Sequence, residues 1–146
     1  MLKQKVIVSA CLLGECCRYD GKTKIDNKVI VFLDRYEIIP FCPEAPLFGT
    51  PRERINVVNI EGENRILKDT SNEDVTDLLK DEIERFIEKY PHADAIVLKA
   101  KSPSCGNGTT PILNEKKEPI AYGDGIAAKI FKEKYKDILI KDENFF

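Results

Sequence analysis

Five cysteines stand out among the side chains that could do chemistry, because thiolates are the soft ligands that iron–sulfur clusters, zinc and Cu(I) require. Three of them share a position: Cys11, Cys42 and Cys105 each follow a short apolar run that is typical of a buried strand. In a parallel α/β sheet, the loops that leave the carboxyl ends of the strands converge on one edge, where ligand sites form. We therefore expect these three thiols to meet at one site. Each also precedes a potential helix start, which favours the thiolate form.

The spacing of the cysteines does not by itself choose the chemistry. No C-x-x-C pair marks a zinc ribbon or a thioredoxin-like motif, and small buried cysteines are common in ordinary cores. Cys16 and Cys17 are adjacent, so at most one of them is expected to face the site. His92 is the only histidine, and it follows Pro91 at a helix end. There a solvated role is favoured over a Cys–His nucleophilic pair.

Polar side chains near the three cysteines could move protons or orient a ligand. Glu44 lies two residues after Cys42, where it could exchange protons with a bound ligand or cap a following helical turn. Ser102 and Ser104 approach Cys105, where their hydroxyls could bond a substrate or fold the turn. Other polar residues that we expect on this edge are Ser9, Arg18, Asp20, Arg52, Lys99 and Asp124.

The elements that must position these side chains alternate between strands and helices. Strands are predicted at residues 5–9, 37–41, 95–99 and 137–141, with a hairpin over 57–67. Helices are predicted at 26–36, at 73–90 with Ser71 or Asn72 as its cap, and from Asp124 onward. Residues 45–54 contain Pro46 and Pro51 and are predicted to be loop. We expect one α/β domain over residues 1–146, an open, mostly parallel sheet with helices on both faces and the cysteine loops at the carboxyl ends of its strands.

The composition limits the class of protein. The chain has 146 residues and a net charge of −2, so it carries no bulk positive field for holding a phosphate backbone, and nucleic acid is not expected as a partner. No apolar run is long enough for a signal peptide or a membrane span, so we expect a cytoplasmic protein without a membrane partner. In that reducing compartment, an odd number of cysteines favours metal binding, catalysis or plain burial over disulfides.

Four motifs occur in an order that is characteristic of one family. They are Val8-Ser9-Ala10-Cys11-Leu12-Leu13-Gly14, Cys17-Arg18-Tyr19-Asp20-Gly21, Cys42-Pro43-Glu44 and Ser102-Pro103-Ser104-Cys105-Gly106. With these motifs the chain resembles the thiouracil desulfidase family of small iron–sulfur proteins, from residue 6 to about residue 135. The loops after Cys42 and Cys105 depart from the family pattern. Both are expected to border the pocket, where Pro46 and Phe48 could narrow it or stack on a base-like ring.

The resemblance implies a [4Fe–4S] cluster held by Cys11, Cys42 and Cys105, with one iron left open to bind the sulfur of a small thio-substituted heterocycle. It also implies a desulfidase that converts thiouracil to uracil and sulfide without net redox change. In such an enzyme, Glu44 and one serine of the motif before Cys105, Ser102 or Ser104, are the candidates for moving protons and orienting the ring.

Two alternatives to this function stay open at the level of the sequence. In the first, the same three thiols hold zinc or an iron–sulfur centre without catalysis, and Glu44 is dispensable. In the second, the protein is a thiol enzyme that uses one nucleophilic cysteine, Cys11 or Cys105. The first predicts a bound metal without turnover, and the second predicts one essential cysteine among replaceable ones.

Overall fold

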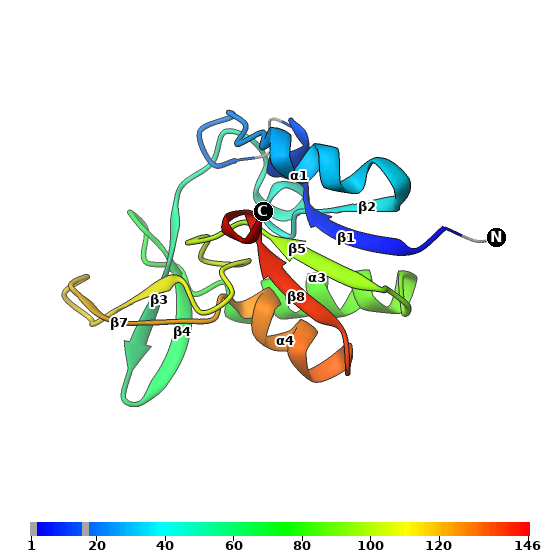
Figure 1. The fold of residues 1–146 in the computed structure, drawn as a ribbon. Helices are drawn as coiled ribbons and strands as arrows, with labels where there is room; N and C mark the ends of the chain where they lie inside the picture. The colour runs from blue at the N-terminus through cyan, green and yellow to red at the C-terminus, as the bar shows by residue number, and fades with distance from the viewer. Residues whose placement is uncertain (1–2, 16–17) are drawn as a thin grey trace.

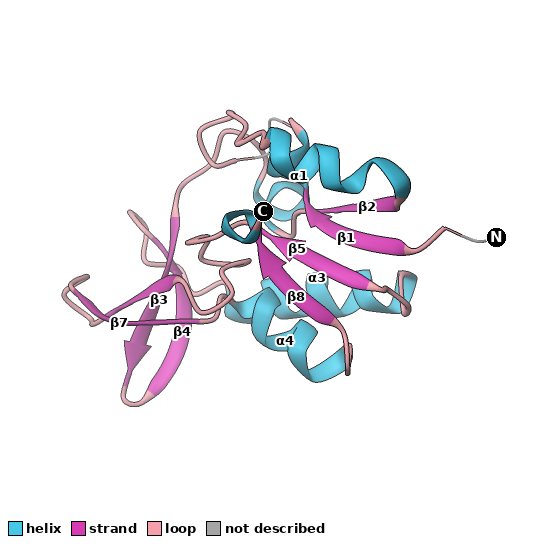
Figure 2. Ribbon diagram, in the orientation of Figure 1, coloured by secondary structure: helices cyan, strands magenta, loops and turns pink. Residues whose placement is uncertain are grey.

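The computed structural model describes residues 3–15 and 18–146, and these form two four-stranded sheets (Figures 1 and 2). The first sheet is entirely parallel, in the order β2-β1-β5-β8. Its strands are β1 (Lys5–Ser9), β2 (Glu37–Phe41), β5 (Ala95–Leu98) and β8 (Leu139–Asp142). The predicted parallel sheet is thus confirmed. Pro40 stands in β2, at the edge of the sheet, where a proline is tolerated.

Helices cover both faces of the parallel sheet, as predicted. Because side chains alternate along a strand, Val6 and Val8 of β1 point to one face and Ile7 points to the other. The two valines pack against α1 (Asn27–Phe32), and Ile7 packs with α3 (Thr76–Lys89) and α4 (Ile126–Lys134). Figure 1 shows α1 above the sheet and α3 and α4 below it. Each face therefore has its own apolar core.

The second sheet consists of two hairpins in the order β4-β3-β6-β7. The first hairpin, β3 (Ile55–Ile60) with β4 (Glu63–Lys68), confirms the hairpin predicted over residues 57–67. The second, β6 (Thr110–Leu113) with β7 (Pro119–Gly123), is not evident in the sequence, because both strands are short and contain a proline. Parallel pairing of β3 with β6 joins the hairpins, and Figure 2 shows this sheet beyond the carboxyl edge of the first one.

Two helices, α1 and α3, differ from the predicted ones at their ends. Asp26 caps α1 through its side chain, as expected, but α1 ends at Phe32 and continues as a short 3-10 turn. The other helix, α3, begins at Thr76, so the prediction that Ser71 or Asn72 caps it is wrong. The helix starts late because the chain first forms an isolated β-bridge back to β4.

A short helix occupies part of the segment that the sequence predicts as loop. This helix, α2 (Glu44–Phe48), begins shortly after β2 and contains Pro46. Proline is accepted there because an amide in the first helical turn has no intrahelical partner to lose. The helix places Glu44 at the end of the parallel sheet. None of the helices in the described part of the chain has the length and apolar content needed to cross a membrane.

Phe131 provides a test of the core below the sheet. Its side chain is fully buried, and its ring centre lies 4.9 Å from that of Phe41 and 5.5 Å from that of Tyr135. Phe131→Ala should lower the free energy of unfolding by about 3–5 kcal/mol, because lost burial and a residual cavity both destabilise the fold. Phe145→Ala, at a ring that is 58% exposed, should cost less than about 1 kcal/mol. Urea denaturation compares the two variants, and equal losses would contradict this core.

Candidate functional site

A cavity of about 360 Å³ lies at the carboxyl edge of the parallel sheet, and the structure brings Cys11, Cys42 and Cys105 together on its wall. Cys11 lies in the 3-10 turn after β1, Cys42 directly follows β2, and Cys105 lies in the loop after β5. A cavity of this size is typical of small-ligand sites. Within residues 3–15 and 18–146, no three His, Cys, Asp or Glu side chains form a group that could hold a single metal ion. Cys16 and Cys17 lie outside the described residues.

Cys105 is the most deeply buried of the three thiols. Burial is the main reason why the pKa of its thiol rises to about 12, and the nearby charges of Cys42 and Glu44 raise it as well. Hydrogen bonds with the hydroxyls of Ser9 and Ser104 oppose the rise. The prediction that a helix start favours the thiolate is therefore wrong for Cys105. The loss of water around the sulfur outweighs the hydrogen bonds that it receives.

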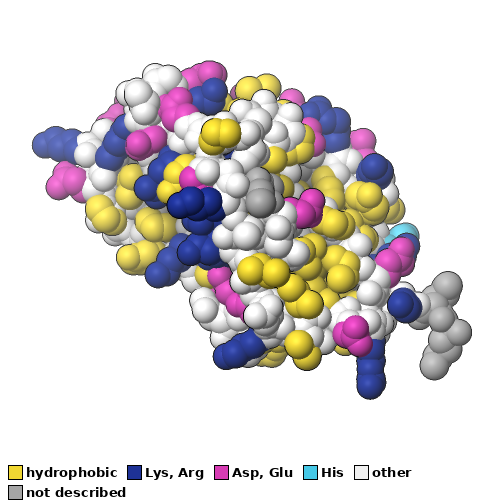
Figure 3. Space-filling model, turned by 90° about the horizontal axis from the view of Figure 1, so that it is seen from above, with side chains coloured by type: hydrophobic (Ala, Val, Ile, Leu, Met, Phe, Trp, Pro, Cys, Tyr) yellow, Lys and Arg dark blue, Asp and Glu magenta, His cyan; other side chains and the backbone are white. Residues whose placement is uncertain are grey.

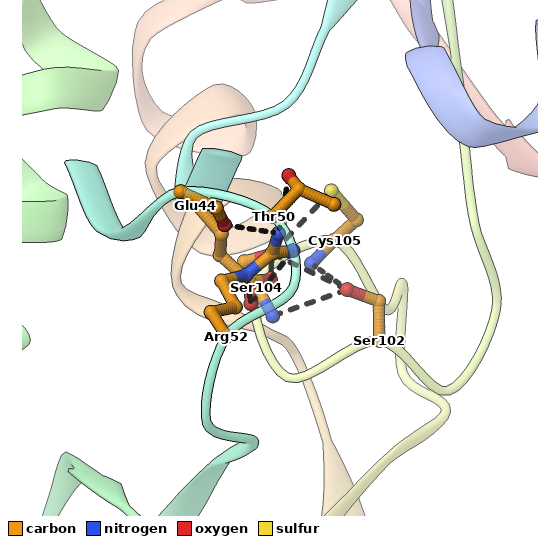
Figure 4. Close-up of polar contacts among 7 residues, drawn as sticks. Glu44, Thr50, Arg52, Ser102, Ser104 and Cys105 are labelled. Carbon is orange, nitrogen blue, oxygen red and sulfur yellow. Dashed lines mark hydrogen bonds and ion pairs between the residues drawn. The ribbon is translucent and has the colours of Figure 1, made fainter. Parts of the chain in front are cut away.

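Glu44 points its carboxylate toward the cavity from the start of α2. The residue is 8% exposed and lines the cavity wall. One carboxylate oxygen, Oε2, accepts a hydrogen bond of 2.6 Å from the Ser104 hydroxyl (Figure 4). The other, Oε1, lies 3.4 Å from Nε of Arg52 in a buried ion pair. Both oxygens are thus anchored close to the thiols, an arrangement suited to a group that exchanges protons with a ligand.

Ser102 and Ser104 form a pair of hydroxyls that leads to Glu44. Their Oγ atoms lie 3.2 Å apart, and Ser102 Oγ also accepts hydrogen bonds from the amides of Ser104 (3.3 Å) and Cys105 (3.1 Å). Because the single hydroxyl proton of Ser104 is donated to Glu44, Ser102 is the donor between the two serines. Ser102 therefore folds the turn, and the two hydroxyls also form a chain of donors that ends at the carboxylate.

Ser9, at the end of β1, is a further polar residue beside the thiols. Its Oγ accepts a hydrogen bond of 2.9 Å from the amide of Lys99, which leaves the hydroxyl proton available for Cys105. The ammonium of Lys99 is itself held 2.8 Å from Oε2 of Glu143. The sequence places Ser9 and Lys99 on this edge, but it gives no local sign of these distant partners.

Basic side chains outnumber acidic ones on the wall of the cavity. Besides Arg52, the basic lining residues are Arg18, Lys24, Arg54, Lys99 and Lys101. Glu44 is the one acidic residue among the described residues of the lining. The guanidinium carbons of Arg18 and Arg54 lie 5.7 and 5.2 Å from the ring centre of Tyr19, so two cations contact one aromatic ring. Figure 3, which views the molecule from the side of α1, shows Lys and Arg side chains gathered on one part of that face.

Several residues that the sequence predicts near this site lie elsewhere. The described residues that line the cavity do not include Asp20, Asp124, Pro46 or Phe48. The predicted stacking role of Phe48 is therefore wrong: the α2 helix turns its ring toward the core cluster around α3. His92 is exposed and lines a separate hollow, as expected for a residue away from the cysteines.

The loop that carries Ser104 and Cys105 is anchored by the start of α4. The amide of Ala127 donates to the carbonyl of Ser104 at 2.7 Å, and the amide of Gly125 donates to the carbonyl of Gly106 at 2.8 Å. The first amides of a helix lack intrahelical acceptors, so the loop carbonyls complete the helix while the helix fixes the loop. A Cβ at position 125 would lie 2.6 Å from the carbonyl carbon of Ser104, which leaves room only for glycine.

Known proteins share this sequence and this fold over most of the chain. A family model described as 2-thiouracil desulfurase matches residues 6–143. The uncharacterized protein YbbK of Bacillus subtilis (strain 168) is 33% identical, over 88% of this chain and 89% of that protein. A solved structure described as the [4Fe-4S]-dependent thiouracil desulfidase TudS superposes with a TM-score of 0.76 at 31% identity, over 97% of this chain and 92% of the other. The matched residues include all three cysteine loops.

Substitution of Gly125 tests how tightly α4 holds the loop. Gly125→Ala should lower the free energy of unfolding by about 1–3 kcal/mol, because the methyl group would press on the backbone of Ser104. Gly123→Ala is the matched control, since a Cβ there meets only the end of the Ile112 side chain, which can rotate away. Thermal unfolding followed by circular dichroism measures both, and a Gly125→Ala variant as stable as wild type would overturn the close contact.

Proposed function

The chain belongs to the 2-thiouracil desulfurase family, and on this premise we propose that it hydrolyses the C–S bond of thiolated pyrimidines with the help of a [4Fe–4S] cluster. Family membership makes the protein an enzyme that cleaves C–S bonds. In the proposed reaction, thiouracil and water give uracil and hydrogen sulfide. The oxygen of water replaces the sulfur, whose electron pair leaves with it, so neither reactant is oxidised or reduced.

The observation that carries the proposal is that three thiols and one anchored carboxylate meet in the same cavity. Cys11, Cys42 and Cys105 supply three soft sulfur ligands, the donor set that suits an iron–sulfur cluster. With three ligands for its four irons, a bound cluster supplies one open iron, a Lewis acid with a preference for the thiocarbonyl sulfur. TudS, which has a similar fold, is described as [4Fe-4S]-dependent, and this supports the same cofactor here.

Glu44 is the residue that we assign to take a proton from the attacking water. Its Oε2 already accepts one hydrogen bond from Ser104, and the remaining lone pairs of the carboxylate can accept another. The Ser104 hydroxyl can donate its proton toward the departing sulfur, and Glu44 can then return the proton that it took from water to the Ser104 oxygen through their 2.6 Å contact. Ser102 holds that oxygen in place from 3.2 Å. Ser102 and Ser104 therefore act with Glu44 as one unit that moves protons and orients the ring.

Metal analysis of cysteine variants tests the cofactor. Protein purified without oxygen should contain about four iron and four acid-labile sulfide per chain, and Cys11→Ser, Cys42→Ser and Cys105→Ser should each lose most of both, because each removes a thiolate ligand. Cys16→Ser is the matched control and should retain the wild-type content.

The same measurement separates the alternatives. Zinc in place of iron would overturn the proposed cofactor and favour a zinc site. Little metal of any kind after anaerobic reconstitution would favour a thiol enzyme. In that case Cys11 is the stronger candidate nucleophile, because burial keeps the Cys105 thiol protonated at neutral pH, with its pKa raised to about 12.

Substitution of Glu44 tests the catalytic assignment. Glu44→Gln should lower kcat for sulfide release from 2-thiouracil or 4-thiouracil by about 10²–10⁴-fold, because the amide cannot accept the proton of water. Iron content should stay at the wild-type value. Asp124→Asn is the control, since Asp124 lies outside the cavity lining and an amide oxygen can still accept from the backbone of Gly108. A Glu44→Gln enzyme that is as active as wild type, with its cluster intact, would overturn the role of this carboxylate.

A further inference from the structure

Arg52 lies in the cavity wall and forms an ion pair with Glu44. Among the ion pairs of the described residues, no other basic side chain contacts this carboxylate. Its side chain is only 5% exposed. Nε and Nη2 lie 3.4 and 3.5 Å from the same oxygen of the carboxylate, Oε1. Because Oε2 is taken by the Ser104 hydroxyl, the two partners hold the two ends of the carboxylate and restrict its rotation (Figure 4).

The guanidinium of Arg52 is itself held from the other side. Nη1 donates to the carbonyl of Gly49 at 3.1 Å and approaches the hydroxyl of Thr50 at 3.4 Å. The backbone amide of Arg52 donates to the carbonyl of Tyr19 at 2.6 Å. The planar fork of an arginine can bridge Gly49 and Glu44 at the same time, whereas a lysine ammonium is a single point of charge on a flexible stem. Hydrogen bonds to the backbone after α2 therefore fix the guanidinium in the position from which it contacts the carboxylate.

Because Glu44 is buried, its charged form depends on this ion pair. A carboxylate with little access to water is stable only where other groups replace its hydration, and here Arg52 and Ser104 do so. Arg54 also lines the cavity and stands two residues away, but its guanidinium contacts the ring of Tyr19. Loss of Arg52 would thus leave Glu44 without its buried cation, while Arg54 stays on Tyr19 and Lys99 stays on Glu143.

We propose that Arg52 is a positioning residue of the desulfidation reaction: it fixes the orientation of the Glu44 carboxylate so that Oε2 faces Ser104. The expected effect on turnover rests on the proposed function, whereas the contact by which Arg52 holds Glu44 against Ser104 does not. In this assignment Arg52 acts on the reaction through Glu44.

Turnover of single and double variants tests this assignment. Arg52→Met should lower kcat by up to about 10²-fold, the size expected for a misplaced catalytic group, while KM and iron content stay near wild type. Arg52→Lys should recover part of the loss, because it restores charge without the fork. In Glu44→Gln combined with Arg52→Met, kcat should equal that of Glu44→Gln alone, because residues that act as a unit are not additive.

Arg85→Met is the activity control, because Arg85 lies outside the cavity lining, and it should leave kcat within about threefold of wild type. Arg54→Met serves as the comparison for the loss of another positive charge from the cavity wall. Full additivity of Arg52→Met with Glu44→Gln would overturn the assignment, because it would mean that Arg52 acts independently of Glu44. A raised KM with unchanged kcat, shared by Arg52→Met and Arg54→Met, would also overturn it and assign Arg52 to substrate binding.

Crystal structures of the variants separate failure of this inference from failure of the proposed function. In Arg52→Met the contact between Glu44 Oε2 and Ser104 Oγ should lengthen beyond hydrogen-bond distance, and in Arg54→Met it should keep its 2.6 Å. An unchanged contact in Arg52→Met would refute the positioning role, whether or not the wild-type protein acts on thiouracils. If Arg52→Met does not fold, Arg52→Lys carries the same comparison, with a smaller displacement of the carboxylate expected.

Discussion

Parallel pairing of β1 with β2 on one side and β5 on the other determines where the three cysteine loops begin. The register places Ser9 of β1 beside Phe41 of β2, and Val8 beside Val97 of β5. Three strands that run in the same direction therefore end at nearly the same level. Cys11 lies in the turn after β1, Cys42 directly follows β2, and Cys105 lies in the loop that leaves β5. Thiols that are far apart in sequence meet because the sheet aligns the strand ends.

Polar groups can be buried in this cavity only because each one satisfies the next. The Ser104 hydroxyl binds Glu44, Glu44 binds Arg52, and the start of α4 binds the carbonyl of Ser104. A buried network of this kind is stable when every member has its partner and costly when one is missing. The two sheets contribute to the same network, since Arg52 belongs to the segment that leads into β3, whereas α4 packs under the parallel sheet. The site thus couples parts of the fold that do not pair directly.

The sequence predicts what short-range patterns encode, and it misses what distant segments build together. Residues 5–9 and 95–99 are recognisable strands because each is an apolar run, and their ends place Cys11 and Cys105 at the correct edge. The second hairpin is hidden, because its strands contain prolines and too few β-branched residues for a periodic signal. No short-range sequence pattern indicates that Arg52 pairs with Glu44. The pocket role predicted for Phe48 is wrong because the sequence does not reveal the α2 helix, which turns the ring inward.

The chemistry of Cys105 shows why burial and metal affinity are linked in such a site. Without a metal, the apolar surroundings favour the neutral thiol, and its pKa is raised to about 12. A thiolate ligand must lose that proton, so metal binding at this residue is coupled to proton release and weakens as the pH falls. The hydroxyl of Ser9 can donate to the sulfur and would stabilise its negative charge once the proton has left. In the proposed cluster site, the sulfur of Cys105 would therefore be neutral before metal binding and anionic after it.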